Sequence, residues 1–282
     1  MSEDPPAASI DKNEATLPDL PAPDLALVAA LEERAFGAWP AEEVKVLDGW
    51  RLRHTRGVTR RANSVWTSGD VREQPPSPLR SLSDRLAEVE AFYRDRGQPA
   101  MYQLSPVAAP VGLDEVLAAR GYEIEAPVEV QVADVAPLLD RHRPLAGVRT
   151  ELTGVPSARW FEVSALRGRF AAVADIYRGL LGRLGDRALY VLAEQRGVPA
   201  AVGLGVIDRD WMGIFAMSTL PELRRMGLGT TVLGTLAGAA AQRGVARLYL
   251  QVEVDNAAAR QLFAGAGFRP AYRYHYRIAA RA

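Results

Sequence analysis

One stretch of the sequence combines glycines, arginines and a proline in an arrangement that suits phosphate binding. It runs from Thr219 to Gly229, between a predicted strand and a predicted helix. The free N–H groups in the first turn of a helix carry partial positive charge, and Gly227 and Gly229 let ligand oxygens approach that backbone closely. Arg224 or Arg225 can add a charge-assisted hydrogen bond. The stretch therefore predicts an anion site, although such glycines also merely end strands and permit close packing.

A second motif follows the next predicted strand, Ala246 to Val252. The chain there reads Glu-Val-Asp-Asn-Ala-Ala-Ala-Arg-Gln-Leu-Phe from Glu253 to Phe263. We call the stretch from Thr219 to Gly229 the glycine loop. Together with it, this segment resembles the GNAT superfamily of N-acetyltransferases, in which the pattern Val-x-Pro-x-x-Arg-x-x-Gly-x-Gly forms a pyrophosphate loop. The resemblance is clear from about residue 188 to 277 and looser from residue 160. It rests on Pro221, Arg224, Gly227, Gly229, Asn256, Ala259 and Gly267-Phe268, with Thr219 in place of the family's valine.

The resemblance implies the GNAT fold, an α/β (mixed α+β) architecture in which a splayed mixed sheet is flanked by helices. Strands 211–218 and 246–252 would separate to admit the pantetheine arm of coenzyme A, with acetyl-CoA as the cofactor. Backbone groups of Met217 to Thr219 would hydrogen-bond that arm, and Asn256 would meet it further along, although Asn256 also fits a helix N-cap. The implied cofactor-binding residues are Met217, Ser218, Thr219, Arg224, Arg225, Met226, Gly227, Leu228, Gly229, Thr230, Asn256, Ala259 and Phe263.

The implied reaction is direct attack of a primary amine on the acetyl thioester. It requires a base, a stabilised oxyanion and an acid for the departing thiolate. Backbone N–H groups near Met217 to Thr219 are the candidate for the oxyanion. Glu253 is the candidate base, because it shares one face of a period-two strand with Gln251 and ends that strand. Asp255 and Asp210 are weaker alternatives, and a solvated charge at a strand end explains Glu253 equally well.

The acid is where the sequence departs from the family. Many members place a tyrosine where this chain has Phe263, and phenylalanine has no proton to give. Tyr272, Tyr274 and Tyr276 alternate on one face of the last predicted strand, and Tyr272 and Tyr274 are our candidate catalytic residues. Tyr249 or water can serve instead, and aromatic residues at alternate strand positions commonly stabilise a sheet only by packing.

The elements that must position these residues fall into two series. Residues 24–135 read as helix, hairpin, helix, strand, helix and strand, and residues 158–282 share that order before their terminal strands. The connection at 136–157 holds prolines and glycines without a sustained period, which favours a linker. We therefore expect two tandem GNAT-like lobes after a flexible tail at residues 1–23, with the second lobe catalytic and the first degenerate.

The first lobe is expected to hold two strands, Val44 to His54 and Thr59 to Thr67, joined by a turn at Arg56-Gly57. It looks like the degenerate N-terminal halves of some two-lobed bacterial GNAT proteins. Arginines of this hairpin, among them Arg60 and Arg61, can bind an anionic group of the acceptor or simply solvate the surface.

The long helix of the first lobe, expected from about Pro78 to Arg96, has no glycine loop before it. The corresponding stretch is Pro75-Pro76-Ser77-Pro78, without a Gly-x-Gly or paired arginines. We therefore expect no coenzyme A in this lobe.

The composition of the chain limits the kinds of molecule that it is expected to bind. Lys plus Arg and Asp plus Glu both number 34, so the formal charge of zero gives no overall case for nucleic acid or an anionic membrane. The chain has no cysteine and only three scattered histidines, so we expect no disulfide and no metal site. No segment approaches a membrane-spanning length, and we expect a cytoplasmic monomer or homodimer.

Two hypotheses from different functional classes follow. The first is an acetyl-CoA-dependent enzyme that acetylates a primary amine of a small molecule, such as an amino acid, polyamine or antibiotic, or of a peptide. The second, motivated by Phe263, is a non-catalytic acyl-CoA-binding or regulatory module. A third, a nucleotide-binding regulator, lacks the aspartate or serine that such loops need.

Overall fold

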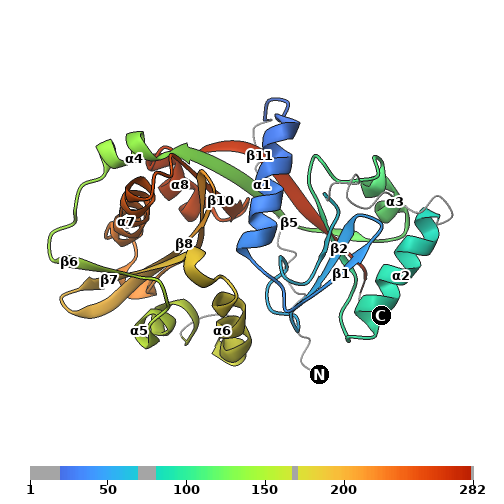
Figure 1. The fold of residues 1–282 in the computed structure, drawn as a ribbon, viewed down its shortest axis with the longest axis horizontal. Coiled ribbons are helices and arrows are strands. Elements are labelled where there is room, and N and C mark those ends of the chain that lie inside the picture. The colour runs from blue at the N-terminus through green and yellow to red at the C-terminus, as the bar shows by residue number, and fades with distance from the viewer. Residues whose placement is uncertain (1–19, 69–80, 167–170, 281–282) are drawn as a thin grey trace, which may run out of the picture.

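The computed structural model describes residues 20–68, 81–166 and 171–280. Within these ranges, helices pack against one long sheet (Figure 1). Residues 1–19 of the expected tail, and the proline-rich break with the expected helix start at Pro78, lie outside the described residues.

The helices and strands have the following bounds. The α-helices are α1 (Leu25–Ala38), α2 (Leu82–Arg94), α3 (Leu113–Ala119), α4 (Val135–Arg141), α5 (Ala158–Phe161), α6 (Ala174–Gly182), α7 (Leu228–Gln242) and α8 (Ala257–Gly265). The strands are β1 (Glu43–Leu47), β2 (Trp50–His54), β3 (Val65–Trp66), β4 (Met101–Leu104), β5 (Glu123–Asp134), β6 (Val148–Thr153), β7 (Ala188–Gln195), β8 (Val198–Asp208), β9 (Trp211–Thr219), β10 (Arg247–Glu253) and β11 (Arg269–Ile278). Short 3₁₀ or π turns are η1 (Glu162–Leu166), η2 (Ala171–Val173), η3 (Gly185–Arg187) and η4 (Pro221–Leu223).

The strands of the described chain form a single mixed sheet in the order β1-β2-β3-β4-β11-β5-β10-β9-β8-β7-β6. β5, which belongs to the first series of elements, pairs antiparallel with β10 of the second series. β11, which ends the second series, pairs antiparallel with β4 of the first and with β5. Each half therefore contributes one long strand to the other, and Figure 1 shows β5 and β11 crossing the middle of the molecule.

Side-chain alternation along the central strands builds a separate core on each face of the sheet. Tyr249 of β10 packs on the face covered by α1, α5 and α6. Leu248, Leu250 and Val252 of the same strand pack on the opposite face, under α7 and α8. A third core lies in the first half, where α2 and α3 cover β2 and β4 (Figure 1).

A buried carboxylate ties α1 to the first half of the sheet and to β11. Glu32 is fully buried, and its Oε1 accepts a hydrogen bond from the Tyr272 hydroxyl at 2.7 Å. Its Oε2 accepts from Trp66 Nε1 at 3.2 Å and Gln103 Nε2 at 3.0 Å. Burial raises the pKa of the Glu32 carboxyl, against the opposing effect of these donors and of the nearby Arg53.

The Glu32 carboxyl predicts a pH dependence of stability. Because its pKa is raised in the folded protein, the fold binds this proton more tightly than the unfolded chain does. Its stabilising contribution is complete below about pH 4.3, the ordinary glutamate pKa, and is lost as the pH rises through the raised value. In Glu32→Gln the free energy of unfolding should therefore fall less between acidic and neutral pH, measured by urea denaturation. An unchanged pH dependence would contradict this assignment.

The first hairpin differs from the expected one. Residues 44–54 form two strands because Asp48 and Gly49, with φ of 46° and 83°, make a two-residue turn between Leu47 and Trp50. Asp-Gly is a strong hairpin signal in a sequence. Expecting one strand here was wrong, because the alternating pattern on either side hid the turn.

The second expected strand of that hairpin is mostly a loop. The Asn63 side chain accepts hydrogen bonds from Thr55 N at 2.8 Å and Gly57 N at 3.0 Å, and donates to Val58 O at 2.7 Å and Thr59 O at 2.8 Å. One side chain thus satisfies four backbone groups that a strand would otherwise pair. Only β3 remains extended.

The segment 136–157 contains regular structure. Most of α4 falls in it, and β6 pairs antiparallel with β7 along its whole length, from Val148–Gln195 to Thr153–Tyr190. Because these elements are short and are bounded by prolines and glycines, their hydrophobic periodicity is too brief to be recognised in the sequence.

Candidate functional site

The site is built where two neighbouring parallel strands separate. β9 and β10 are paired from Trp211 and Arg247 as far as Ile214 and Leu250. Beyond this point β9 bends away: Ala216 has a φ of 49°, and the pairing of β9 with β8 shifts register between Phe215 and Ser218. Such a bulge bends a strand and frees part of its backbone from the ladder. The last residues of β9 therefore face a gap instead of β10.

A cavity of about 730 Å³ lies along this gap on the face covered by α7 and α8. It is lined by the end of β9, by the glycine loop with the start of α7, and by α8 along its length. Of the residues expected to bind the cofactor, all but Met226 line it: Met217, Ser218, Thr219, Arg224, Arg225, Gly227, Leu228, Gly229, Thr230, Asn256, Ala259 and Phe263. The Met226 side chain is exposed. The sequence motif thus converges on one cavity.

The glycine loop presents backbone donors to this cavity. Gly227, with a φ of 82°, precedes α7 and supplies no side-chain cap. The first α7 bond runs from Thr231 N to Gly227 O at 3.0 Å, so the N–H groups of Leu228, Gly229 and Thr230 have no partner within the helix. A Cβ on Gly229 would lie 2.8 Å from Leu262 Cδ1. Close packing against α8, and not only the approach of a ligand to the backbone, therefore explains the second glycine.

Two arginines lie at the mouth of the glycine loop. Arg224 Nε donates to Thr219 O at 3.4 Å, and Arg225 Nη1 donates to Gln261 Oε1 at 3.3 Å. Neither is held by a carboxylate among the described residues, so both keep their charge available. Positive charge beside free helix N–H groups suits a bound anion.

Asn256 and Phe263 line the larger cavity from α8. Asn256 Oδ1 accepts from Ala259 N at 3.1 Å, so it caps the helix while lining the cavity; the N-cap is confirmed, and contact with the pantetheine arm stays a prediction. Phe263 is buried, with its ring centroid 5.8 Å from that of Phe268. It therefore contributes an apolar wall.

A second cavity, of about 440 Å³, lies on the other face of the sheet. Phe215 and Ala216 line it from β9, immediately before Met217, which lines the larger cavity. The two cavities therefore approach each other at the β9 bulge, one from each face of the sheet. The polar groups of the smaller cavity come from β10, β11 and the loop before β3, and include Arg56, Arg60, Arg61, Gln251, Glu253, Tyr274 and Tyr276.

Glu253 lies at the rim of the smaller cavity. Its Oε1 accepts from Arg60 Nη1 at 3.1 Å, and Arg60 Nε also donates to Glu125 at 2.8 Å. Gln251 lines the cavity from the same face of β10, as the alternation predicted. The Glu253 carboxylate is thus held beside the cavity and is 44% exposed.

The three tyrosines of β11 belong to the same hydrophobic core, but their hydroxyl groups have different surroundings. Tyr274 and Tyr276 line the smaller cavity, and the Tyr274 hydroxyl donates to Gln251 Oε1 at 3.2 Å. Tyr272 does not line this cavity, and its hydroxyl donates to Glu32 in the interior. Burial raises the pKa of all three hydroxyls, and Arg61 acts in the opposite direction on Tyr274 and Tyr276. Tyr274 and Tyr276 therefore keep their protons at neutral pH.

The weaker sequence candidates lie elsewhere. Asp210 is ion-paired with Arg34 at 3.1 Å and also with Arg247, and these bonds lower its pKa despite the opposing effect of desolvation. Asp255 is exposed and lines neither cavity. Tyr249 is buried between Trp211 and Phe215.

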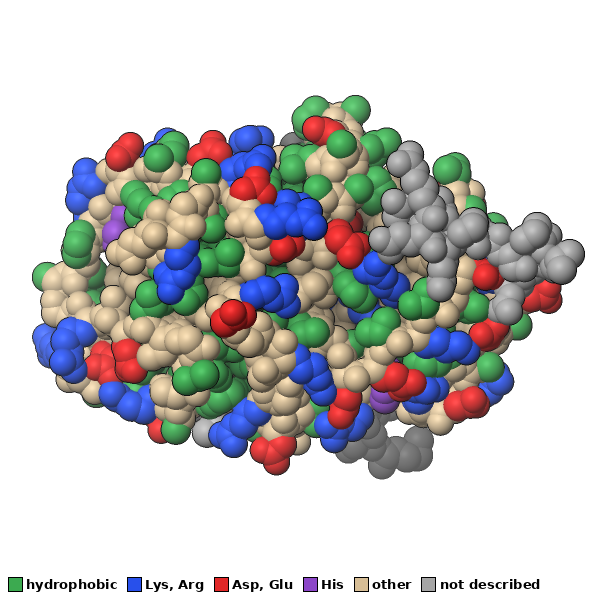
Figure 2. Space-filling model, viewed as in Figure 1, with side chains coloured by type: hydrophobic (Ala, Val, Ile, Leu, Met, Phe, Trp, Pro, Cys, Tyr) green, Lys and Arg blue, Asp and Glu red, His purple; other side chains and the backbone are tan. Residues whose placement is uncertain are grey.

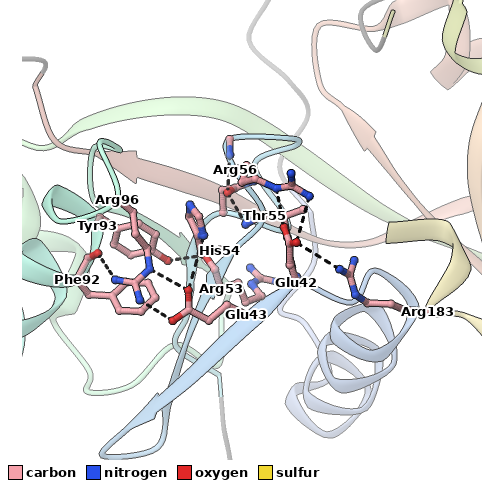
Figure 3. A network of polar contacts seen from close by, with 12 residues as sticks. Glu42, Glu43, Arg53, His54, Thr55, Arg56, Phe92, Tyr93, Arg96 and Arg183 are labelled. Atoms are coloured by element: carbon pink, nitrogen blue, oxygen red, sulfur yellow. Dashed lines mark hydrogen bonds and ion pairs between the residues drawn. The ribbon is translucent and has the colours of Figure 1, made fainter. Parts of the chain in front are cut away.

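The loop before β3 is anchored to both halves of the chain. Glu42 accepts from Arg56 Nε at 2.8 Å and Arg56 Nη2 at 3.1 Å, and its Oε1 lies 3.9 Å from Arg183 Nη2 at the end of α6. Thr55 Oγ1 accepts from the Glu42 backbone N–H at 2.9 Å. Figure 3 shows Glu42 between the two arginines. The loop is therefore fixed where it closes the smaller cavity.

Known structures share this architecture. A GCN5-related N-acetyltransferase from Kribbella flavida superposes with a TM-score of 0.66 at 18% identity, covering 93% of this chain and 98% of that one. A tandem GNAT protein from the clavulanic acid biosynthesis pathway gives a TM-score of 0.58 at 18% identity, covering 73% of each chain. At this identity the two likenesses establish the fold alone.

Sequence relatives decide the family. The uncharacterized N-acetyltransferase YobR of Bacillus subtilis (strain 168) is 31% identical over 253 residues, which cover 89% of this chain and 98% of that protein. Residues 26–277 match the family model described as probable histone acetyltransferase Rv0428c C-terminal. The chain belongs to this family of GNAT N-acetyltransferases. The expected family, the splayed mixed sheet flanked by helices and the assignment as an enzyme are thereby confirmed.

The part of the GNAT site that sequence reasoning missed comes mostly from the first half. Trp39 and Val58 line the smaller cavity, and Arg60 pairs with Glu253 across 193 positions of sequence. The adjacent arginines were a signal for anion binding, but nothing in the sequence placed them beside β10. Residues so distant in sequence are brought together only by the exchange of β5 and β11.

Among the described residues, no three His, Cys, Asp or Glu side chains cluster so as to hold a metal ion. None of the described helices is both long and apolar enough to cross a membrane. On the face drawn in Figure 2, acidic and basic side chains are interspersed.

Proposed function

We propose that this enzyme transfers the acetyl group of acetyl-CoA to a primary amine of a small molecule or peptide. The observation that carries the proposal is the approach of two cavities to each other at the β9 bulge, one lined by the glycine loop and the other by ionisable side chains. A donor and an acceptor can therefore approach one another from opposite faces of the sheet.

The larger cavity fits coenzyme A by its chemistry. The free N–H groups of Leu228 to Thr230, with Arg224 and Arg225, suit a pyrophosphate. The edge of β9 that faces away from β8, from Met217 to Thr219, is not paired with β10 and can hydrogen-bond an amide-containing arm in the manner of an added strand. When bound there, acetyl-CoA supplies an acetyl group activated as a thioester. The N–H groups at the end of β9 are the donors that would stabilise negative charge on the acetyl oxygen.

Glu253 is the proposed base. It ends β10 at the rim of the acceptor cavity, and its bond to Arg60 fixes its orientation. A carboxylate in this position can accept a proton from the acceptor's ammonium group, directly or through one water. The amine then attacks as the neutral nucleophile.

Tyr274 is the proposed acid, because its hydroxyl is in the acceptor cavity and remains protonated at neutral pH. Tyr274→Phe should lower kcat about 100-fold by removing the proton for the departing thiolate. Tyr272→Phe is the matched control, since it makes the same change on the same strand away from the cavity. It should lower the unfolding temperature, by leaving Glu32 short of a donor, and spare kcat. Equal kcat values for wild type and Tyr274→Phe would exclude this role.

Release of free thiol tests the proposed function. The enzyme is mixed with acetyl-CoA and each member of an amine panel, and product is confirmed by mass spectrometry. Sustained amine-dependent release supports the proposal. Coenzyme A binding without turnover on any amine would contradict it.

A further inference from the structure

Arg61 is placed differently from the other cations of the acceptor cavity. Its guanidinium carbon lies 5.5 Å from the ring centroids of both Trp39 and Phe215. Trp39 is itself fixed by a hydrogen bond from its Nε1 to Thr59 Oγ1 at 2.9 Å. Contact with aromatic rings holds a guanidinium while leaving its edge N–H groups free to donate. Arg61 is thus oriented without using its donors.

These donors have no acceptor in the described chain. Arg61 forms no hydrogen bond or ion pair with any described residue, and its Nη1 is buried without a partner. Its neighbours in the cavity are neutralised: Arg56 is paired with Glu42 (Figure 3), and Arg60 with Glu125 and Glu253. Arg61 is only partly buried, but leaving its buried Nη1 without an acceptor is costly, so this position suits a ligand that brings a negatively charged acceptor.

A second donor in the same cavity is also without a partner. Gln251 Oε1 accepts from Tyr274, whereas Gln251 Nε2 is buried and makes no hydrogen bond within the described residues. Arg61 and Gln251 come from distant parts of the chain and line one cavity. Both require acceptor oxygens, and a carboxylate offers two.

Negative charge is in excess around Glu253, at the rim of the same cavity. One arginine, Arg60, is shared by two carboxylates, Glu125 and Glu253. This end of the cavity therefore favours an ammonium group, while Arg61 favours an anion. The cavity volume of about 440 Å³ suits a small molecule.

We propose that the acceptor is a small amine that also carries a carboxylate, such as an amino acid, and that Arg61 binds this carboxylate with Gln251 as a second donor. The inference rests on the proposed function. Under it, Arg61 is a specificity residue that orients the amine toward Glu253 and the β9 bulge.

Matched acceptor pairs test this inference. Amino acids and their primary amides, which differ only in the carboxylate, are compared by kcat/KM for thiol release. Wild type should prefer the acids by about 30-fold or more, the effect of one buried charge-assisted contact. Arg61→Gln should lose that preference through slower turnover of the acids alone, and Arg61→Lys should retain part of it. Arg269→Gln, which removes an exposed arginine that lines neither cavity, should retain it fully.

The outcomes separate this inference from the proposed function. Turnover of amines with no preference for acids, or a preference that survives in Arg61→Gln, would overturn the role of Arg61 and leave the acetyltransferase activity standing. Absence of turnover on every acceptor would contradict the proposed function and this inference with it. The unfolding temperature and its rise on adding coenzyme A show that each variant is folded and binds the donor.

Discussion

Gly227→Trp should abolish coenzyme A binding, with a loss of affinity of at least about 100-fold. The indole would occupy the cavity where the glycine loop offers its N–H groups, and two charge-assisted hydrogen bonds are together worth about 3–6 kcal/mol. The fold itself has room for the added Cβ, which would meet nothing closer than Leu145 Cδ2 at 3.6 Å. Calorimetric titration with coenzyme A measures the loss.

Gly227→Ala is the matched control for backbone strain. Both variants force a side chain onto a residue with a φ of 82°, which costs each about 1 kcal/mol of stability. Both should therefore lower the unfolding temperature similarly, whereas the alanine variant should keep most of its affinity. Wild-type affinity in a folded tryptophan variant would refute the assignment of the glycine loop.

Glu253→Gln should lower kcat about 1000-fold, because the amide keeps an oxygen for Arg60 but cannot accept the proton. The dependence of kcat on pH should also change. In the variant kcat should rise only as the bound acceptor amine loses its own proton without a base, at higher pH than in wild type. The affinity for coenzyme A should not change, since Glu253 does not line the donor cavity.

Glu125→Gln distinguishes proton transfer by Glu253 from the effect of removing one negative charge. Glu125 binds the same Arg60, so the variant removes an equal charge from the same network, but Glu125 does not line the acceptor cavity. Its kcat should fall far less than that of Glu253→Gln. An equal fall in both variants would mean that the network's charge, and not proton transfer by Glu253, controls the rate.

The lining of the larger cavity could be predicted because it is local in sequence. The requirements of a phosphate cradle, glycine backbone and adjacent cations at a helix start, all fall between Thr219 and Thr230. Strand alternation likewise placed Gln251 and Glu253 on one face of β10. It also placed Tyr272 and Tyr274 together, but it could not show that one hydroxyl meets Glu32 and the other the cavity.

The acceptor side could not be predicted because it depends on pairing between distant strands. β5 lies between β10 and β11. The hydrophobic pattern of residues 123–134 does not specify these neighbours, because any buried strand would have a similar pattern. The contact of Arg60 with Glu253 follows from that arrangement. The Asp48-Gly49 turn is a different case, because its signal was present in the sequence.

The exchange of β5 and β11 makes the two halves inseparable. A chain cut anywhere between β5 and β6 would leave the second half with an open edge on β10, and its final strand without either neighbour. The first half would lose β11 and, with it, the tyrosine that binds the buried carboxylate of α1. The half without a glycine loop is therefore part of the framework of the other half, and the two should fold as one cooperative unit.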